Sequence, residues 1–255
     1  MKHLADLEEV FKSFRKANMT LKLKKCEFAK GQIDFVGHKV GGGLHRPLFN
    51  KVQAINDITE PVTKKAVKSF LGMMNFFRKF IKNFSHIAFC LTELTKKAAP
   101  NKVKFTPEQS DAFTLLKKLL SECASLHSPN YTKDFIIRSD ASDIAIGACL
   151  LQKDENGEEK PIAFLSSKLT PSQRNWSTIV KEAYGIIFSL NRWDHIIYNS
   201  HIWVLTDNNP LHYIASAIAT APMLIRWSIS LTRWDITVVH IKGIANEAAD
   251  FLSRY

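Results

Sequence analysis

Four acidic residues, far apart in the chain, are the clearest candidates for chemical activity in this sequence. They are Asp140, Glu182, Asp207 and Asp250. Burying an unpaired carboxylate costs several kcal/mol, so a partner is implied wherever such a residue lies within an apolar pattern. Magnesium prefers oxygen ligands of this kind. Two divalent ions held by a carboxylate set can activate water and neutralise charge at a phosphodiester.

The surroundings of each acid favour burial. Asp140 lies in "IIRSDASDIAIGACLLQ", where apolar residues alternate as in two strands, and Asp207 ends the predicted strand "HIWVLTD". Glu182 lies on or beside the apolar stripe of a predicted helix. Asp250 follows two alanines on a short final helix, which lets that helix approach other elements closely.

Each acid taken alone also has an ordinary structural interpretation. In that interpretation the roles are Asp140 as a turn residue, Glu182 as an ion-pair partner of Lys181 or Arg192, Asp207 as a turn initiator and Asp250 as a helix surface charge. The order and spacing of all four together favour the functional interpretation.

The elements that must position these acids begin near residue 129. Period-two alternation predicts three antiparallel strands in "DFIIRSD", "ASDIAIGACLLQ" and "KPIAFLSSKL", with a polar turn "KDENGEE" before the third. A long helix "STIVKEAYGIIFSLNRWDHII" follows, then the strand "HIWVLTD", a helical stretch, the strand "DITVVHIKG" and the helix "NEAADFLSRY". This order predicts an α/β fold with a mixed sheet and flanking helices.

The first half of the chain differs in pattern. Residues 1–20 are predicted to form an amphipathic helix, followed by a strand pair in "LKLKKCEFAK" and "IDFVGHKV", a glycine turn at 41–43 and a short helix over 48–58. A helix is predicted after Pro61, with apolar residues from Val67 to Ile81 at helical spacing. A second is predicted from Thr106, which can cap it, with Pro107 in the first turn.

Charge separates the same two halves. Residues 1–130 hold 23 Lys and Arg against 11 Asp and Glu, a balance of +12, whereas residues 131–255 hold 12 against 13, a balance of −1. Basic residues interleaved with aromatics, as in "KKAVKSFLGMMNFFRKFIKNF", suit a phosphate backbone, although a solvated basic helix face gives the same pattern. The best nucleic-acid-binding candidates are Lys64, Lys65, Lys68, Arg78, Lys79 and Lys82.

Cysteine spacing and hydropathy indicate the cellular environment of the protein. The four cysteines, Cys26, Cys90, Cys123 and Cys149, have no C-x-x-C spacing, so we expect reduced thiols and no cysteine zinc site. No apolar run approaches the roughly 18 residues needed to span a bilayer, and the first residues are helical and acidic, unlike a signal peptide. We expect an intracellular protein, cytoplasmic or nuclear, without membrane contact.

Several motifs resemble the Pol polyprotein of Gypsy-type long-terminal-repeat retrotransposons. The RNase H motifs of that family have counterparts here in "SDASDIAIGACLLQ", "LTPSQRNWSTIVKEAYGI", "LTDNNPLHYI" and "GIANEAADFLSR". By this resemblance Asp140, Glu182, Asp207 and Asp250 are the metal-binding acids. The family's "TDH" is Thr206, Asp207 and Asn208 here, a change that removes no ligand.

The resemblance extends upstream and implies three segments. Residues 1–58 resemble the end of the reverse-transcriptase palm, with "FVGH" at the primer-grip hairpin, residues 59–128 resemble a helical thumb or connection, and residues 129–255 resemble RNase H. The expected fold class is thus an RNase H-like mixed sheet preceded by a palm remnant and a thumb-like region. The polymerase motif Y-x-D-D does not occur in the sequence, so no polymerase activity is expected.

The resemblance implies an endonuclease that hydrolyses the RNA strand of RNA:DNA hybrids with two Mg²⁺ ions, Mn²⁺ being an alternative. His240, ten residues before Asp250, is a further catalytic candidate as a proton carrier, or else a strand residue at a sheet edge. Expected partners are the hybrid and the rest of a retrotransposon Pol or an intact reverse transcriptase. The alternatives are an inactive or domesticated fragment that only binds nucleic acid, and an integrase or transposase core, which the acid spacing disfavours.

Overall fold

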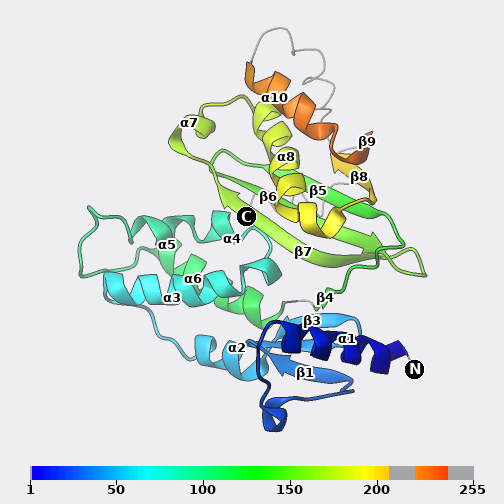
Figure 1. Cartoon of the computed structure of the whole chain (residues 1–255). Coiled ribbons are helices and arrows are strands. Elements are labelled where there is room, and N and C mark those ends of the chain that lie inside the picture. Colours follow the sequence, from blue (N-terminus) through cyan, green and yellow to red (C-terminus); the bar gives the residue numbers. More distant parts are fainter. Residues whose placement is uncertain (1, 124, 207–221, 241–255) are drawn as a thin grey trace.

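The computed structural model describes residues 2–123, 125–206 and 222–240. In these parts of the chain a four-stranded sheet and a five-stranded sheet lie next to each other, with a group of helices beside them (Figure 1). We call residues 49–121 the helical unit.

The N-terminal part consists of a helix, a single turn of 3₁₀ helix and a small antiparallel sheet. Its elements are α1 (Lys2–Lys16), η1 (Leu23–Lys25), β1 (Gln32–Phe35), β2 (His38–Gly41) and β3 (Leu44–Pro47). Gly42 and Gly43 have φ of 60° and 73°, a left-handed conformation that favours glycine, so the predicted glycine turn is confirmed. The strand predicted in residues 21–30 is wrong, because most of its side chains are exposed and the only regular structure there is η1.

The helical unit contains the predicted helices, but the one predicted after Pro61 to extend to Ile81 ends at Phe76, and a turn of 3₁₀ helix follows it. The elements of the unit are α2 (Phe49–Asn56), α3 (Lys64–Phe76), η2 (Arg78–Phe80), α4 (Phe84–Ile87), α5 (Phe89–Glu93) and α6 (Pro107–Ser121). Thr63 caps α3, since its Oγ1 accepts the Ala66 N–H at 3.2 Å. The core of the unit includes Phe70, Met74 and Leu116, each 1% exposed or less. After it, β4 (Leu126–His127) pairs with β3 and closes the N-terminal sheet.

The five-stranded sheet confirms the predicted α/β class. Its strands are β5 (Phe135–Ala141), β6 (Ala145–Lys153), β7 (Glu159–Lys168), β8 (His201–Thr206) and β9 (Asp235–His240). The spatial order is β7-β6-β5-β8-β9; the first three strands form the predicted antiparallel meander, while β8 is parallel to β5 and β9 is parallel to β8. The helices of this part are α7 (Pro171–Arg174), α8 (Thr178–Ile197) and α10 (Pro222–Leu231).

The two faces of this sheet have different neighbours. Helix α8 packs on β5 and β6, and its buried Ile186 and Leu190 share a core with Phe135 and Ile137. The opposite face meets the helical unit, where α4 contacts β6 and β7. Successive strand residues face opposite sides, so Ile137 and Ser139 face α8 whereas Asp140 lies on the face toward α4.

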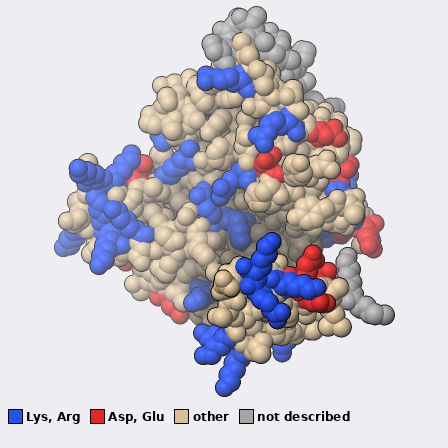
Figure 2. Space-filling model, in the orientation of Figure 1, with Lys and Arg blue, Asp and Glu red and all other residues tan. Residues whose placement is uncertain are grey.

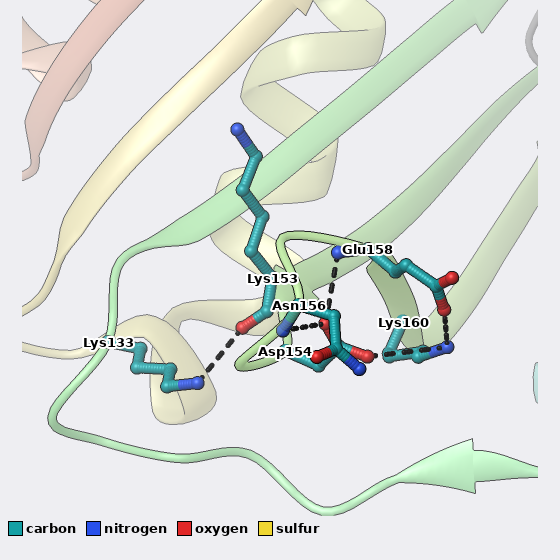
Figure 3. A network of polar contacts seen from close by, with 6 residues as sticks. All are labelled: Lys133, Lys153, Asp154, Asn156, Glu158 and Lys160. Atoms are coloured by element: carbon teal, nitrogen blue, oxygen red, sulfur yellow. Dashed lines mark hydrogen bonds and ion pairs between the residues drawn. The ribbon is translucent and has the colours of Figure 1, made fainter.

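A polar network shapes the turn between β6 and β7, at the far end of the sheet from the carboxyl end of β5. Asp154 Oδ1 accepts the backbone N–H groups of Asn156 at 2.8 Å and Glu158 at 3.0 Å, and Lys160 forms ion pairs with Asp154 and Glu158 (Figure 3). Gly157 completes the turn with φ of 81°. These contacts confirm the turn predicted in "KDENGEE".

A buried seam joins the helical unit to β7. The Ser85 N–H donates to Ser166 Oγ at 2.8 Å, and the Arg78 guanidinium donates to Ser85 Oγ at 3.1 Å and to the Ser166 carbonyl oxygen. The backbone and side chain of Ser166 therefore both bind the helical unit. None of the helices in the described ranges is both long and apolar enough to cross a membrane.

Candidate active site

Asp140 lies where β5 ends. The run from Phe135 to Ile137 is buried within the strand, and Asp140 is the last residue but one, directly before Ala141. Its Oδ1 accepts the Ala141 N–H at 2.8 Å. Asp140 pairs with Gly147 of β6, so both residues lie on the same face of the sheet. Asp140 is partly exposed.

Glu182 lies on α8, the helix that packs against β5. Lys181 Nζ forms an ion pair with Asp143 Oδ1 at 2.8 Å, so the first turn of α8 contacts the turn that follows β5. One turn later, a Cβ on Gly185 would lie 3.9 Å from the Ser139 side chain. Glu182 lies between these two contacts and is 8% exposed. The fold thus brings together the elements that carry the first two predicted acids.

The other predicted site residues follow the neighbouring strands. β8 pairs with β5 in parallel, and β9 pairs with β8 in parallel, so the carboxyl ends of all three meet at one edge of the sheet. Asp207 directly follows Thr206, the last residue of β8, but lies outside the described residues, as does Asp250. His240 is the last residue of β9 and pairs with Thr206, which places its backbone at the same edge.

The donor chemistry at this edge fits a hard divalent cation. Asp140 and Glu182 supply carboxylate oxygens, which suit Mg²⁺ or Mn²⁺ and not a soft metal. Within the described residues no group of three or more His, Cys, Asp or Glu side chains is placed to hold a metal ion. Two of the four predicted ligands, Asp207 and Asp250, lie outside those residues, so the complete set remains a prediction.

The predicted nucleic-acid-binding residues fall into two groups. Lys65 and Lys68 are exposed on α3, while Lys64 Nζ donates to the backbone oxygens of Lys97 at 3.2 Å and Ala99 at 2.9 Å. Arg78, Lys79 and Lys82 lie at the other end of the helical unit and are partly buried. Lys and Arg side chains gather over the helical unit and in the hollow near the middle of the face in Figure 2.

Burial lowers the pKa values of the three cations in the second group. Burial, followed by the charge of Arg192, lowers the pKa of Arg78, and burial lowers the pKa of Lys79. Burial lowers the pKa of Lys82 to about 8, with a smaller lowering from Arg138 that opposes the effect of Cys149. The charged forms of these residues are therefore disfavoured at the seam, and a bound anionic ligand would offset this cost.

A groove of about 820 Å³ lies between the N-terminal sheet, η2, β7 and α8. Its lining includes the cations Arg78, Lys79 and Arg192 and the aromatic Phe35, and none of the described residues that line it is acidic. A groove of this composition suits a polyanion with planar groups.

Two residues near Asp140 were not predicted from the sequence. Asn83 and His86, from the helical unit, line a small cavity together with Asp140. No local motif marks them, because their proximity to Asp140 depends on the docking of α4 on the sheet. The only hint in the sequence is that Asn83 lies between a segment rich in aromatic and basic residues and the start of the next helix.

Comparisons with known proteins show which proteins the chain resembles. Residues 130–234 match the model of the RNase H-like domain found in reverse transcriptase. The retrovirus-related Pol polyprotein from transposon 297 of Drosophila melanogaster is 34% identical over 252 residues, which cover 99% of this chain and 23% of that polyprotein. The transposon Tf2-3 polyprotein of Schizosaccharomyces pombe is 30% identical over 256 residues, 99% of this chain and 19% of that polyprotein.

Solved structures show the same fold. The foamy viral protease-reverse transcriptase in complex with RNA/DNA hybrid has a TM-score of 0.76 and 24% identity, covering 94% of this chain and 33% of that one. The complex of the same kind of protein with dsDNA has a TM-score of 0.73. The chain thus spans a quarter or less of the curated polyproteins described above and a third of the hybrid-bound chain.

Proposed function

Since the chain carries the RNase H-like domain of a reverse transcriptase and is homologous to Gypsy-type retrotransposon Pol polyproteins, we propose that it is a metal-dependent endonuclease acting on RNA:DNA hybrids. It hydrolyses the RNA strand. The observation that supports this proposal is the packing of β5, which carries Asp140, against α8, which carries Glu182.

The residues proposed to hold two Mg²⁺ ions are Asp140, Glu182, Asp207 and Asp250. The chemistry supplied by bound divalent cations is activation of water and neutralisation of charge on the phosphodiester. Glu182 is 8% exposed and lies on α8, whose Lys181 forms an ion pair with the exposed Asp143 in the turn after β5. His240 is proposed to carry a proton to or from the reacting oxygens.

The substrate is proposed to lie across both halves of the chain. Exposed Lys65 and Lys68 on α3 and the cations of the acid-free groove hold phosphates, which contributes affinity that falls with salt. Contacts to 2′-hydroxyl groups select RNA in the strand that is cut. The hybrid is therefore the expected partner, alongside the remainder of a Pol polyprotein.

A strand-resolved cleavage assay tests this proposal. Four duplexes of one sequence are compared in Mg²⁺ and in EDTA: the hybrid labelled on RNA, the hybrid labelled on DNA, double-stranded RNA and double-stranded DNA. We expect short products only from the RNA strand of the hybrid and only with metal. Tight hybrid binding without any product would instead support a fragment that only binds nucleic acid.

A further inference from the structure

A small polar cavity lies at the seam, directly beside Asp140. The helical unit contributes Asn83 and His86, and the five-stranded sheet contributes Asp140, Ser142 and Ser166. Its volume is about 10 Å³, which is close to the space that one water molecule requires. A buried water needs about two to four polar partners, and side chains able to bond it converge here from both halves of the chain.

Asn83 reaches this cavity through an unusual backbone conformation. Its φ is 52°, in the left-handed region, where asparagine is tolerated better than most residues. The residue ends the stretch after η2 and precedes α4, so this conformation turns the chain toward the sheet. Its position is held by the next residues, because the Ser85 N–H donates to Ser166 Oγ at 2.8 Å.

The sheet is shaped to receive the Asn83 side chain. Asn83 Oδ1 lies 2.6 Å from the point that a Cβ on Gly147 would occupy, so any side chain at position 147 displaces the amide. Gly147 lies between Asp140 of β5 and Ser166 of β7 in the strand register. The missing side chain of Gly147 thus lets a residue of the helical unit approach the strand position opposite Asp140.

We propose that Asn83 and His86 are positioning residues of the candidate active site, which hold one water molecule in this cavity and through it fix the Asp140 carboxylate. The Asn83 carboxamide can donate and accept, the His86 ring can do either, and a carboxylate oxygen can accept from a water molecule that they hold. The catalytic consequence of this inference rests on the proposed nuclease function.

It follows that the nuclease site is shared by both halves of the chain. The helical unit does more than hold substrate, because the orientation of a metal-binding carboxylate depends on how α4 is docked. Loss of a residue that orients a metal ligand typically costs 10 to 100-fold in metal affinity or activity.

Three variants and a matched control test the inference. Asn83→Gly removes the amide but tolerates the same φ, and Gly147→Ala displaces the amide without changing Asn83. The double variant combines them. The control is Asn199→Gly, which makes the same substitution at φ of 55° in the turn between α8 and β8, remote from Asp140.

Hydrogen exchange at residues 139–147 of the metal-free protein is measured together with cleavage of the hybrid. We expect Asn83→Gly and Gly147→Ala each to accelerate exchange and to lower kcat by about 10-fold, with an unchanged KM for the hybrid. The double variant should be no worse than either single variant, because both remove the same contact. Asn199→Gly should match the wild type in both measurements.

The two proposals fail in distinguishable ways. If the wild type cuts the hybrid and Asn83→Gly cuts as fast, with unchanged exchange, the positioning role is wrong while the nuclease stands. If the wild type cuts nothing, the nuclease function fails and hydrogen exchange alone decides the inference. In that case equal exchange in Asn83→Gly and Asn199→Gly overturns it.

Discussion

At the scale of single residues, two aspartates three positions apart have different environments. Asp140 lies on β5, faces the seam and lines the cavity shared with Asn83. Asp143 lies in the following turn, with its side chain 94% exposed, and pairs with Lys181. Lys181 holds the pKa of Asp143 below its usual range through a hydrogen bond and its charge. Of the two, only Asp140 is proposed as a metal ligand.

Replacing each of these aspartates separates their roles. Asp140→Asn should lower hybrid cleavage by at least about 100-fold, because it removes a charged metal ligand. Its affinity for the hybrid, measured without metal by fluorescence anisotropy, should not fall. Asp143→Asn serves as the matched control and should retain most of the activity. Equal activity of Asp140→Asn and the wild type would remove Asp140 from the site.

Two histidines make the stability of the N-terminal sheet depend on pH. Burial, followed by Lys79 and His38, lowers the pKa of His45 to about 4, and burial followed by Lys79 lowers the pKa of His38. His38 stacks on Phe76 with ring centroids 4.9 Å apart, and His45 meets Phe80 at 5.1 Å. Both rings are therefore neutral in the folded protein at pH 7.

Acid should destabilise the protein through these rings. An unfolded histidine titrates near about 6.5, so between that pH and about 4 the unfolded chain binds more protons than the folded one. The free energy of unfolding should fall as pH drops through this window. Urea unfolding of the wild type and of His45→Phe at pH 7 and pH 4.5 checks this, because the variant should lose less. An equal loss in both would contradict the assignment.

At the scale of elements, local signals predicted what local interactions determine. The period-two runs that became β5 to β7 and the helical spacing of α3, α6 and α8 all follow from alternating burial along one element. Residues 21–30 carry the same alternation, yet they remain exposed and form no strand, since no neighbouring strand of the described chain covers them. Alternation predicts a strand only where a partner exists.

Elements that depend on distant contacts were missed. The two-residue strand β4 exists because β3 pairs with it, and α4 is a single turn whose residues Phe84 and Ser85 are buried against distant segments. The candidate site divides in the same way. Motifs identified Asp140 and Glu182, whereas Asn83 and His86 become neighbours of Asp140 only through the docking of α4.

The cap of α3 offers a test at this scale. Thr63→Ala removes the Oγ1 that accepts the Ala66 N–H, so the free energy of unfolding should fall by about 1 kcal/mol. Chemical denaturation measures the change. Thr63→Ser keeps the hydroxyl and should recover most of the loss, and failure to do so would argue against the cap as the cause.

At the scale of the whole molecule, one set of basic residues serves two purposes. Arg78 joins the helical unit to β7 through Ser85 and Ser166, whereas Lys65 and Lys68 are exposed on α3. All three were predicted to bind nucleic acid. Arg78 therefore contributes to the seam as well as to the proposed phosphate-binding groove, whereas Lys65 and Lys68 have only the proposed role in binding phosphates.

Substitution should separate stability from binding. Arg78→Met should lower the free energy of unfolding by about 1.5 to 3 kcal/mol, because it breaks buried hydrogen bonds of a charged group. Lys65→Ala and Lys68→Ala should leave unfolding unchanged, weaken hybrid binding and reduce its salt slope by about one unit per lost phosphate contact. An unchanged unfolding midpoint for Arg78→Met would contradict its role at the seam.

The central claim is that acids gathered at one edge of the five-stranded sheet cut RNA by means of divalent cations. The most direct measurement follows the labelled RNA strand of a hybrid incubated with purified protein in Mg²⁺, then in excess EDTA, then in restored Mg²⁺. The account predicts that short RNA products accumulate, stop with EDTA and resume when Mg²⁺ returns, while Asp140→Asn yields none. Hybrid that stays bound and intact throughout would contradict it.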